Sequence, residues 1–288
     1  MRECRAGAPA WAVVTALHLT RRGKRGRTRA RSRAIEDGTP LDASDRSTLV
    51  ARVHAESRRL ATEQPQAFGT LRENLQLVTL DVLIENFSNN LTGNGAKNEG
   101  AWQQFFTANT FALKQIFAAP VAFYGEQVHV RSPDMKGAGS QIADFVLFNT
   151  LTRSMVLVEI KTPSTALVAK NKYRGASSAE VYPPDKELSG AIAQLQAQME
   201  SARTDFEQIV RRTPGAAPLD TKVITGAVIA GTFSAMDQLR VDSFVRYRNG
   251  LYGIEVITFD EVLERLLALQ TMLQESGRSW CLGRVSRG

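Results

Sequence analysis

Cysteine and histidine are scarce in this 288-residue sequence, which excludes several kinds of site. The two cysteines, Cys4 and Cys281, lie near opposite ends of the chain, so they build neither a disulfide framework nor a thiolate metal site, and we expect a reducing cytoplasm. The three histidines are scattered, and we expect each to be structural. A Gly-rich phosphate-binding fingerprint, a nucleophilic Ser or Cys triad and an internal repeat are also absent.

Long hydrophobic runs are missing as well. The apolar stretch 6–19 is too short to cross a bilayer and no small-residue cleavage site follows it, so we expect neither a membrane partner nor export. The sequence leaves two explanations of this stretch open. One is an over-extended start codon, and the other is a basic arm that adds non-specific phosphate affinity.

The net charge of +7 is concentrated at the N-terminus. Residues 1–34 carry ten of the 36 Lys and Arg but one of the 29 acids, so the remainder is slightly acidic. We expect residues 1–40 to be a disordered basic tail. The basic composition therefore gives no reason to assign DNA binding to the rest of the chain.

Apolar residues recur at helical spacing within residues 41–95. They predict at least two helices, with a break at Pro65 and a loop from Asn89 to Gly95. No chemistry is visible in this helical segment, and we expect it to support a homo-oligomer.

Residues 96–275 show alternating helical and strand patterns, and residues 276–288 are expected to be a C-terminal tail. The expected elements are a helix over 98–119, strands over 121–130, 142–148 and 155–160, a helix over 185–208, a strand over 223–230, a helix over 235–247, a strand over 253–258 and a helix over 260–273. Thr258 and Glu261 predict a capping box at the last helix. This order predicts an α/β fold in which a mixed sheet is flanked by helices.

Charged residues interrupt two otherwise apolar strands of this region. Glu159 and Lys161 point to one face at the end of the third strand, because side chains alternate along a strand. Asp144 lies in the preceding strand, and a hairpin between the two strands would bring it beside Glu159. Two carboxylates in an apolar setting repel each other, and a divalent cation relieves that repulsion. We therefore expect a site for Mg²⁺, with Mn²⁺ as a substitute, that hydrolyses phosphodiesters.

Two questions about this cluster stay open from the residues alone. Lys161 would either orient and deprotonate the attacking water or neutralise charge that develops on the phosphate. The alternative without chemistry is a strand-end ion pair between Glu159 and Lys161, with Asp144 capping a turn.

Several short motifs around these residues occur in a specific order. They are Asn98-Glu99 through Phe106, Ala143-Asp144-Phe145, Val158 through Pro163, Tyr173-Arg174, Glu187 through Gln194, and Ile257 through Asp260. Together they resemble the nuclease domain of Shedu antiphage defence proteins, within the PD-(D/E)XK nuclease superfamily, over about residues 98–273. The resemblance implies a restriction-endonuclease-like fold for this region.

This resemblance implies metal ligation by Asp144 and Glu159, a catalytic role for Lys161 and a supporting role for Gln194. It also implies that Glu99 adds a third acid to the metal site. The alternatives are a solvated helix N-terminal acid for Glu99 and an interhelical hydrogen bond for Gln194.

A long loop after the third strand carries Lys170, Lys172, Tyr173 and Arg174, which either contact a phosphate backbone or are merely solvated. We expect a cytoplasmic, Mg²⁺-dependent endonuclease that cleaves phage or plasmid DNA in antiphage defence. The alternatives are a repair, transposition or RNA nuclease that uses the same site, and a catalytically inactive DNA-binding or assembly module with the same fold.

Overall fold

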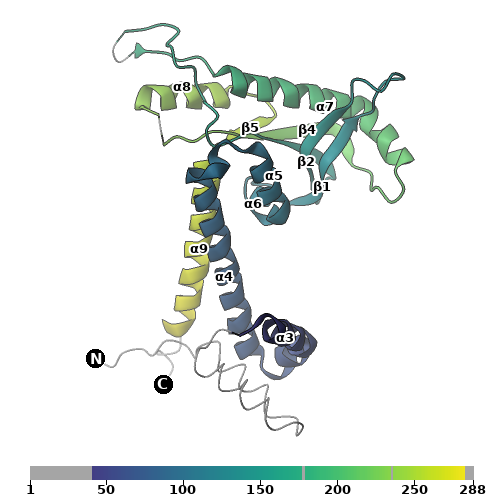
Figure 1. The fold of residues 1–288 in the computed structure, drawn as a ribbon, viewed down its shortest axis with the longest axis vertical. Coiled ribbons are helices and arrows are strands. Elements are labelled where there is room, and N and C mark those ends of the chain that lie inside the picture. The colour runs from purple at the N-terminus through teal and green to yellow at the C-terminus, as the bar shows by residue number, and fades with distance from the viewer. Residues whose placement is uncertain (1–40, 177–178, 235, 283–288) are drawn as a thin grey trace. The chain divides into compact units, whose positions relative to one another are not determined.

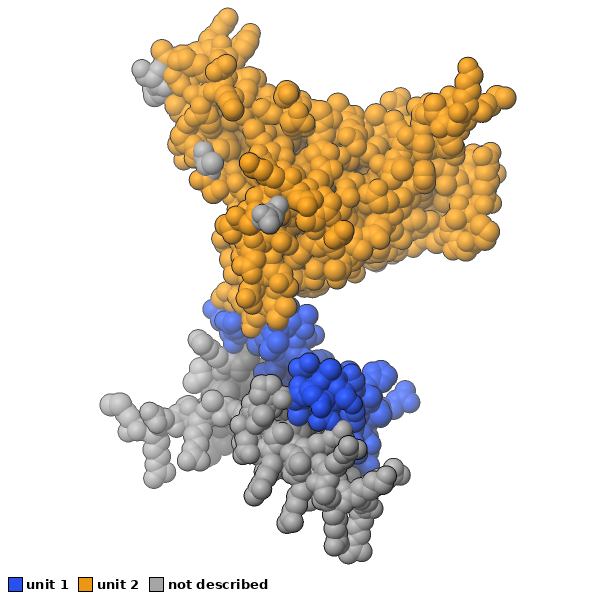
Figure 2. All heavy atoms as spheres, viewed as in Figure 1, with its two compact units in different colours: residues 1–79, 273–288 blue, residues 80–272 orange. Residues whose placement is uncertain are grey.

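The computed structural model describes residues 41–176, 179–234 and 236–282, and the chain divides into two compact units. Residues 80–272 form one unit, which holds the sheet, and the other unit combines residues up to 79 with those from 273 onward (Figure 2). The basic tail expected at residues 1–40 lies outside the described residues. Among the helices of the described part, none is long and apolar enough to cross a membrane.

The elements follow one another in nearly the order expected from the sequence (Figure 1). They are α3 (Ala43–Glu63), α4 (Pro65–Thr92), the 3-10 turn η1 (Asn94–Lys97), α5 (Glu99–Ala108), α6 (Thr110–Lys114), β1 (Val121–Arg131), β2 (Gln141–Asn149), β3 (Ser154–Ile160), α7 (Lys186–Arg212), β4 (Asp220–Ile229), α8 (Gln238–Asn249), β5 (Ile254–Ile257) and α9 (Phe259–Leu282).

Several expected boundaries are wrong. Helix α9 continues to Leu282, beyond the end expected at 273 and into the expected C-terminal tail. The chain stays helical through Asn89 as far as Thr92, because the fully buried Phe87 packs its turn of α4 despite the low helix propensity of the asparagines around it. The single helix expected over 98–119 is broken at Asn109 into α5 and α6. Asn109 leaves the helical conformation (φ −127°, ψ 54°), and its side chain donates at 2.9 Å to the carbonyl of Phe105, which also accepts from its backbone N–H.

The sheet has the strand order β1-β2-β3-β4-β5. Strands β1, β2 and β3 are antiparallel neighbours, whereas β3, β4 and β5 run parallel, so the sheet is mixed. The hairpin between β2 and β3 pairs Phe145 with Val158. The α/β fold with a mixed sheet flanked by helices is thereby confirmed.

Helices cover both faces of this sheet (Figure 1). Helix α7 packs across β1 to β4, with α5 and α6 against the opposite face. The buried residues of α7 recur every three or four positions and form one stripe: Leu188, Ala191, Ile192, Leu195, Gln198, Met199, Ala202 and Phe206. Gln198 is the polar member of this stripe.

An aromatic cluster fixes α5 in place. The indole of Trp102 is fully buried, with ring centroids 4.9 Å from Phe87 and 4.5 Å from Phe259, and its Nε1 donates to the carbonyl of Gly95 at 2.9 Å. Since α5 begins at Glu99, this cluster positions that carboxylate.

The predicted capping box of α9 is present. The backbone N–H of Thr258 donates to Glu261 Oε2 at 2.9 Å, and the backbone N–H of Glu261 donates to Thr258 Oγ1 at 3.4 Å.

Candidate functional site

Asp144 lies on β2 and is almost fully buried. Its Oδ2 accepts a 2.8 Å hydrogen bond from the backbone N–H of Ile160, and its Oδ1 accepts from Gln103 Nε2 at 3.0 Å and from Gln127 Nε2 at 3.2 Å. Gln103 comes from α5 and Gln127 from β1, so three elements fix one carboxylate. Asp144 is not the cap of a turn.

Glu159 lies on β3 with 1% of its surface exposed. The register of the hairpin ends at the pair Phe145–Val158, and Asp144 and Glu159 are the next residue of each strand. Glu159 Oε1 lies 2.8 Å from Lys161 Nζ, and Oε2 accepts a longer bond from Gln198 Nε2 at 3.5 Å. The charges of Asp144 and Lys161 both act on the Glu159 carboxylate, so the three groups interact.

Lys161 follows the end of β3 and is held from both sides. Its backbone N–H donates to the carbonyl of Ile229 at 2.9 Å, which continues the pairing with β4 beyond the last residue of β3. Its Nζ lies 2.8 Å from Glu159 Oε1 and 3.4 Å from Glu99 Oε2. The structure thus brings Glu99 to the cluster through Lys161.

Burial sets the charge states of these groups. Burial, reinforced by the neighbouring charge of Asp144 and opposed by Lys161, raises the pKa of Glu159 to about 7. Burial also raises the pKa of Asp144, which the backbone N–H of Ile160 partly offsets and the charge of Glu99 reinforces. For Lys161, burial alone lowers the pKa, but the contacts with Glu159 and Glu99 outweigh it and the pKa is raised.

This donor set fits a hard divalent cation. Among the described residues, no group of three or more His, Cys, Asp and Glu side chains is arranged to hold a metal ion, so the protein carboxylates gathered here are the pair Asp144 and Glu159. Mg²⁺ takes one or two carboxylates and retains several waters, and two buried carboxylates with raised pKa values are the partners it would relieve.

The supporting role that the resemblance implies for Gln194 remains a prediction, and the structure adds a second glutamine of the same helix to the site. Gln194 is exposed on α7, and the residue one turn later, Gln198, is buried and reaches Glu159. A signal in the sequence was available, because Gln198 continues the apolar stripe of Leu195 and Ala202, whereas Gln194 lies off it.

Two further glutamines were missed by sequence reasoning. Gln103 and Gln127 both reach Asp144. Gln103 lies inside the motif Asn98 through Phe106, where only Glu99 was given a role, and Gln127 lies in none of the motifs. Gln127 adopts a left-handed backbone with φ 48°, a conformation that costs of order 1 kcal/mol or more for a non-glycine residue and recurs at functional sites.

The expected nucleic-acid-contacting residues lie in the segment between β3 and α7. Lys170, Lys172, Tyr173 and Arg174 are all exposed, and Tyr173 is 75% exposed. Lys172 is already paired with Glu180 at 2.6 Å, which partly neutralises its charge. The structure places these four residues outside the Asp144–Glu159–Lys161 cluster.

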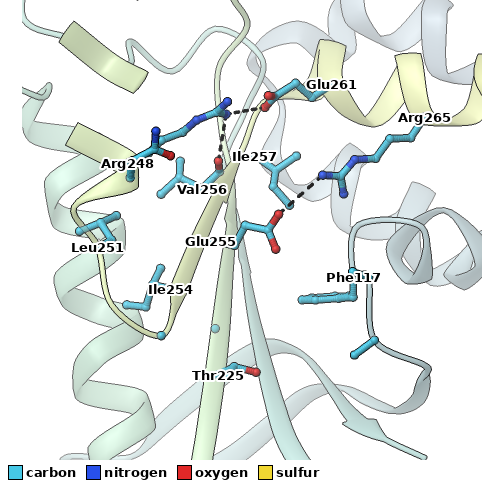
Figure 3. Close-up of a pocket in the computed structure, with 15 residues that line it drawn as sticks. Phe117, Thr225, Arg248, Leu251, Ile254, Glu255, Val256, Ile257, Glu261 and Arg265 are labelled. Carbon is cyan, nitrogen blue, oxygen red and sulfur yellow. Dashed lines mark hydrogen bonds and ion pairs between the residues drawn. The ribbon is translucent and has the colours of Figure 1, made fainter. Parts of the chain in front are cut away.

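A cavity of about 600 Å³ lies elsewhere, along β5 and the segment that follows α6 (Figure 3). Its charged residues pair with one another. Arg248 lies 2.8 Å from Glu261, and Arg265 lies 3.6 Å from Glu255. Asp144, Glu159 and Lys161 do not line it.

Comparison with known proteins gives two matches. The family described as "Shedu protein SduA, C-terminal" matches residues 96–263, a span that includes Glu99, Asp144, Glu159, Lys161 and Gln198. The chain is also similar to the Shedu protein SduA of Bacillus cereus (strain B4264), with 33% identity over 191 residues, 65% of this chain and 48% of the relative. The aligned region thus spans about half the length of that relative.

Proposed function

The chain belongs to the Shedu family, and from this membership together with the buried Asp144–Glu159–Lys161 cluster we propose that it is a Mg²⁺-dependent endonuclease that cleaves DNA in defence against phage. The observation that carries the proposal is the pairing of two buried carboxylates with an ammonium group at one end of a central strand. Such groups are seldom buried without a role, because removing a charge from water is costly.

Asp144 and Glu159 would hold the ion, with Mn²⁺ as a substitute. The bound ion would supply Lewis-acid polarisation of the phosphate and an activated water at neutral pH. The protein's own contribution is to hold the ligands still: Gln103, Gln127 and the backbone N–H of Ile160 orient Asp144 before any ion arrives.

Lys161 is suited to stabilise charge rather than to remove a proton. Its raised pKa keeps the ammonium group protonated at neutral pH, because Glu159 and Glu99 both favour the charged form. A protonated lysine next to the carboxylate pair can orient the substrate phosphate and neutralise the charge that develops on it. This favours one of the two roles that the sequence left open.

The test is metal-dependent cleavage of supercoiled plasmid, with the Lys161→Met variant beside the wild type. We expect cleavage with Mg²⁺, none with EDTA, and a loss of about 100-fold or more in Lys161→Met, since a group that stabilises transition-state charge contributes on this scale. Lys186→Met is the matched control, because Lys186 is highly exposed on α7. A folded Lys161→Met protein that cuts at the wild-type rate would refute the proposed role.

A further inference from the structure

Gln198 links the two strands that carry the carboxylates. It projects from α7 with 2% of its surface exposed, and its Nε2 donates to the backbone carbonyl of Ile142 on β2 at 3.0 Å. The same Nε2 lies 3.5 Å from Glu159 Oε2 on β3. One amide group from the covering helix therefore spans the strand of Asp144 and the side chain of Glu159.

The side-chain amide of Gln198 has one orientation that lets it bond to both Ile142 and Glu159. Turning it over would set Gln198 Oε1 against the carbonyl of Ile142 and the carboxylate of Glu159, which are both acceptors. The NH₂ group must therefore face them. As a consequence, Glu159 is held at both oxygens, by Lys161 at Oε1 and by Gln198 at Oε2.

The other atom of the amide is unsatisfied. Gln198 Oε1 is buried and accepts no hydrogen bond from any of the described residues. A buried acceptor without a donor costs about 1–3 kcal/mol, and an apolar side chain would fit the stripe on either side of this position. A polar residue retained here at that cost is better explained by the site than by the packing of α7.

We propose that Gln198 is a positioning residue that holds the Glu159 carboxylate in the orientation needed to bind a divalent cation, with its free Oε1 as an acceptor for a water molecule of the ion's hydration shell. The inference rests on the proposed function, because it concerns the same metal site. It gives Gln198 a supporting role beside the one that the sequence motifs imply for Gln194.

The experiment measures Mn²⁺ affinity by calorimetry on the full chain, together with thermal unfolding, for the wild type and two variants. Gln198→Met keeps the length and volume of the side chain but removes its donors and its buried acceptor. Gln196→Met makes the same chemical change on the same helix, at an exposed position. We expect Gln198→Met to bind Mn²⁺ about 10- to 100-fold more weakly, as for other residues that orient metal ligands, and Gln196→Met to match the wild type.

The melting temperature distinguishes a positioning role of Gln198 from a purely structural one. Gln198→Met removes an unsatisfied buried oxygen but also the bonds to Ile142 and Glu159, so we expect its melting temperature in EDTA to stay close to that of the wild type while its affinity falls. A lower melting temperature with unchanged affinity would overturn the inference. Gln198→Asn, which withdraws the amide by one methylene, is the second variant if the first does not fold, and we expect the same loss of affinity.

The wild type and Gln198→Met together distinguish a failure of the role of Gln198 from a failure of the proposed nuclease function. A wild-type protein that binds Mn²⁺ and cleaves DNA, with both properties intact in Gln198→Met, overturns the role of Gln198 alone. A wild-type protein that neither binds Mn²⁺ nor cleaves DNA overturns the proposed function, and the inference with it.

Discussion

Acid should stabilise the metal-free protein through Glu159. The pKa of Glu159 is about 7 in the folded protein and 4.5 ordinarily. Between these values the folded state binds more protons than the unfolded state, so the free energy of unfolding falls as the pH rises from 4.5 to 7 and levels off above. At 1.36 kcal/mol per unit, the loss is about 3 kcal/mol.

The other two groups of the cluster do not reverse this trend. The pKa of Asp144 is also raised, from its ordinary value of 3.8, so it acts in the same direction. The raised pKa of Lys161 gives a stabilisation that is present below its ordinary value of 10.5 and is lost above it, outside the window. Titration of Glu159 should therefore dominate the contribution of the site between pH 4.5 and 7.

The assay is urea unfolding in EDTA at several pH values, for the wild type, Glu159→Gln and Glu200→Gln. Glutamine keeps the shape of glutamate but does not ionise, so the difference in stability between the wild type and Glu159→Gln should change by about 3 kcal/mol across the window. Glu200 is exposed on α7, and its variant should track the wild type. A difference between the wild type and Glu159→Gln that stays constant from pH 4.5 to 8 would refute the reasoning.

Three further outcomes are expected. Millimolar Mg²⁺ should raise the melting temperature of the wild type but not of Asp144→Asn, because an ion stabilises only the state that binds it; equal shifts would remove Asp144 from the metal site. Trp102→Ala should lower the free energy of unfolding by about 3–5 kcal/mol, since it empties the centre of the aromatic cluster, whereas Tyr252→Ala, at a fully exposed position, should change it by less than about 0.5 kcal/mol in urea titrations. Deletion of residues 1–34 should flatten the salt dependence of DNA binding measured by fluorescence anisotropy, and an unchanged slope would place the phosphate contacts elsewhere.

The pairing of Asp144 with Glu159 was predictable because local patterns determine it. Two apolar runs separated by a short polar segment form a hairpin, and the alternation of side chains then places both acids on one face. The break at Asn109 was not predictable in the same way. Asn109 turns out of the helical conformation and its side chain bonds locally to the carbonyl of Phe105, and apolar spacing reports neither feature.

The glutamines around the carboxylates were harder to predict because their positions depend on long-range structure. Gln127 reaches Asp144 through the register of β1 against β2, and that register shifts by one position between Phe123 and Gly125. A shift of one residue turns a side chain to the other face of the sheet. The sequence of β1 alone therefore does not assign Gln127 to the site.

Burial of the Asp144 and Glu159 carboxylates costs the folded protein free energy. Burial raises the pKa values of Asp144 and Glu159, which means that the folded protein without a cation is destabilised by their ionisation at neutral pH. Lys161 compensates only in part, since the pKa of Glu159 remains near 7 despite their contact. A purely structural ion pair has no need of a second buried acid beside it, and an apolar replacement would often be as stable. The residual destabilisation is what a second positive charge, such as a divalent ion, would remove.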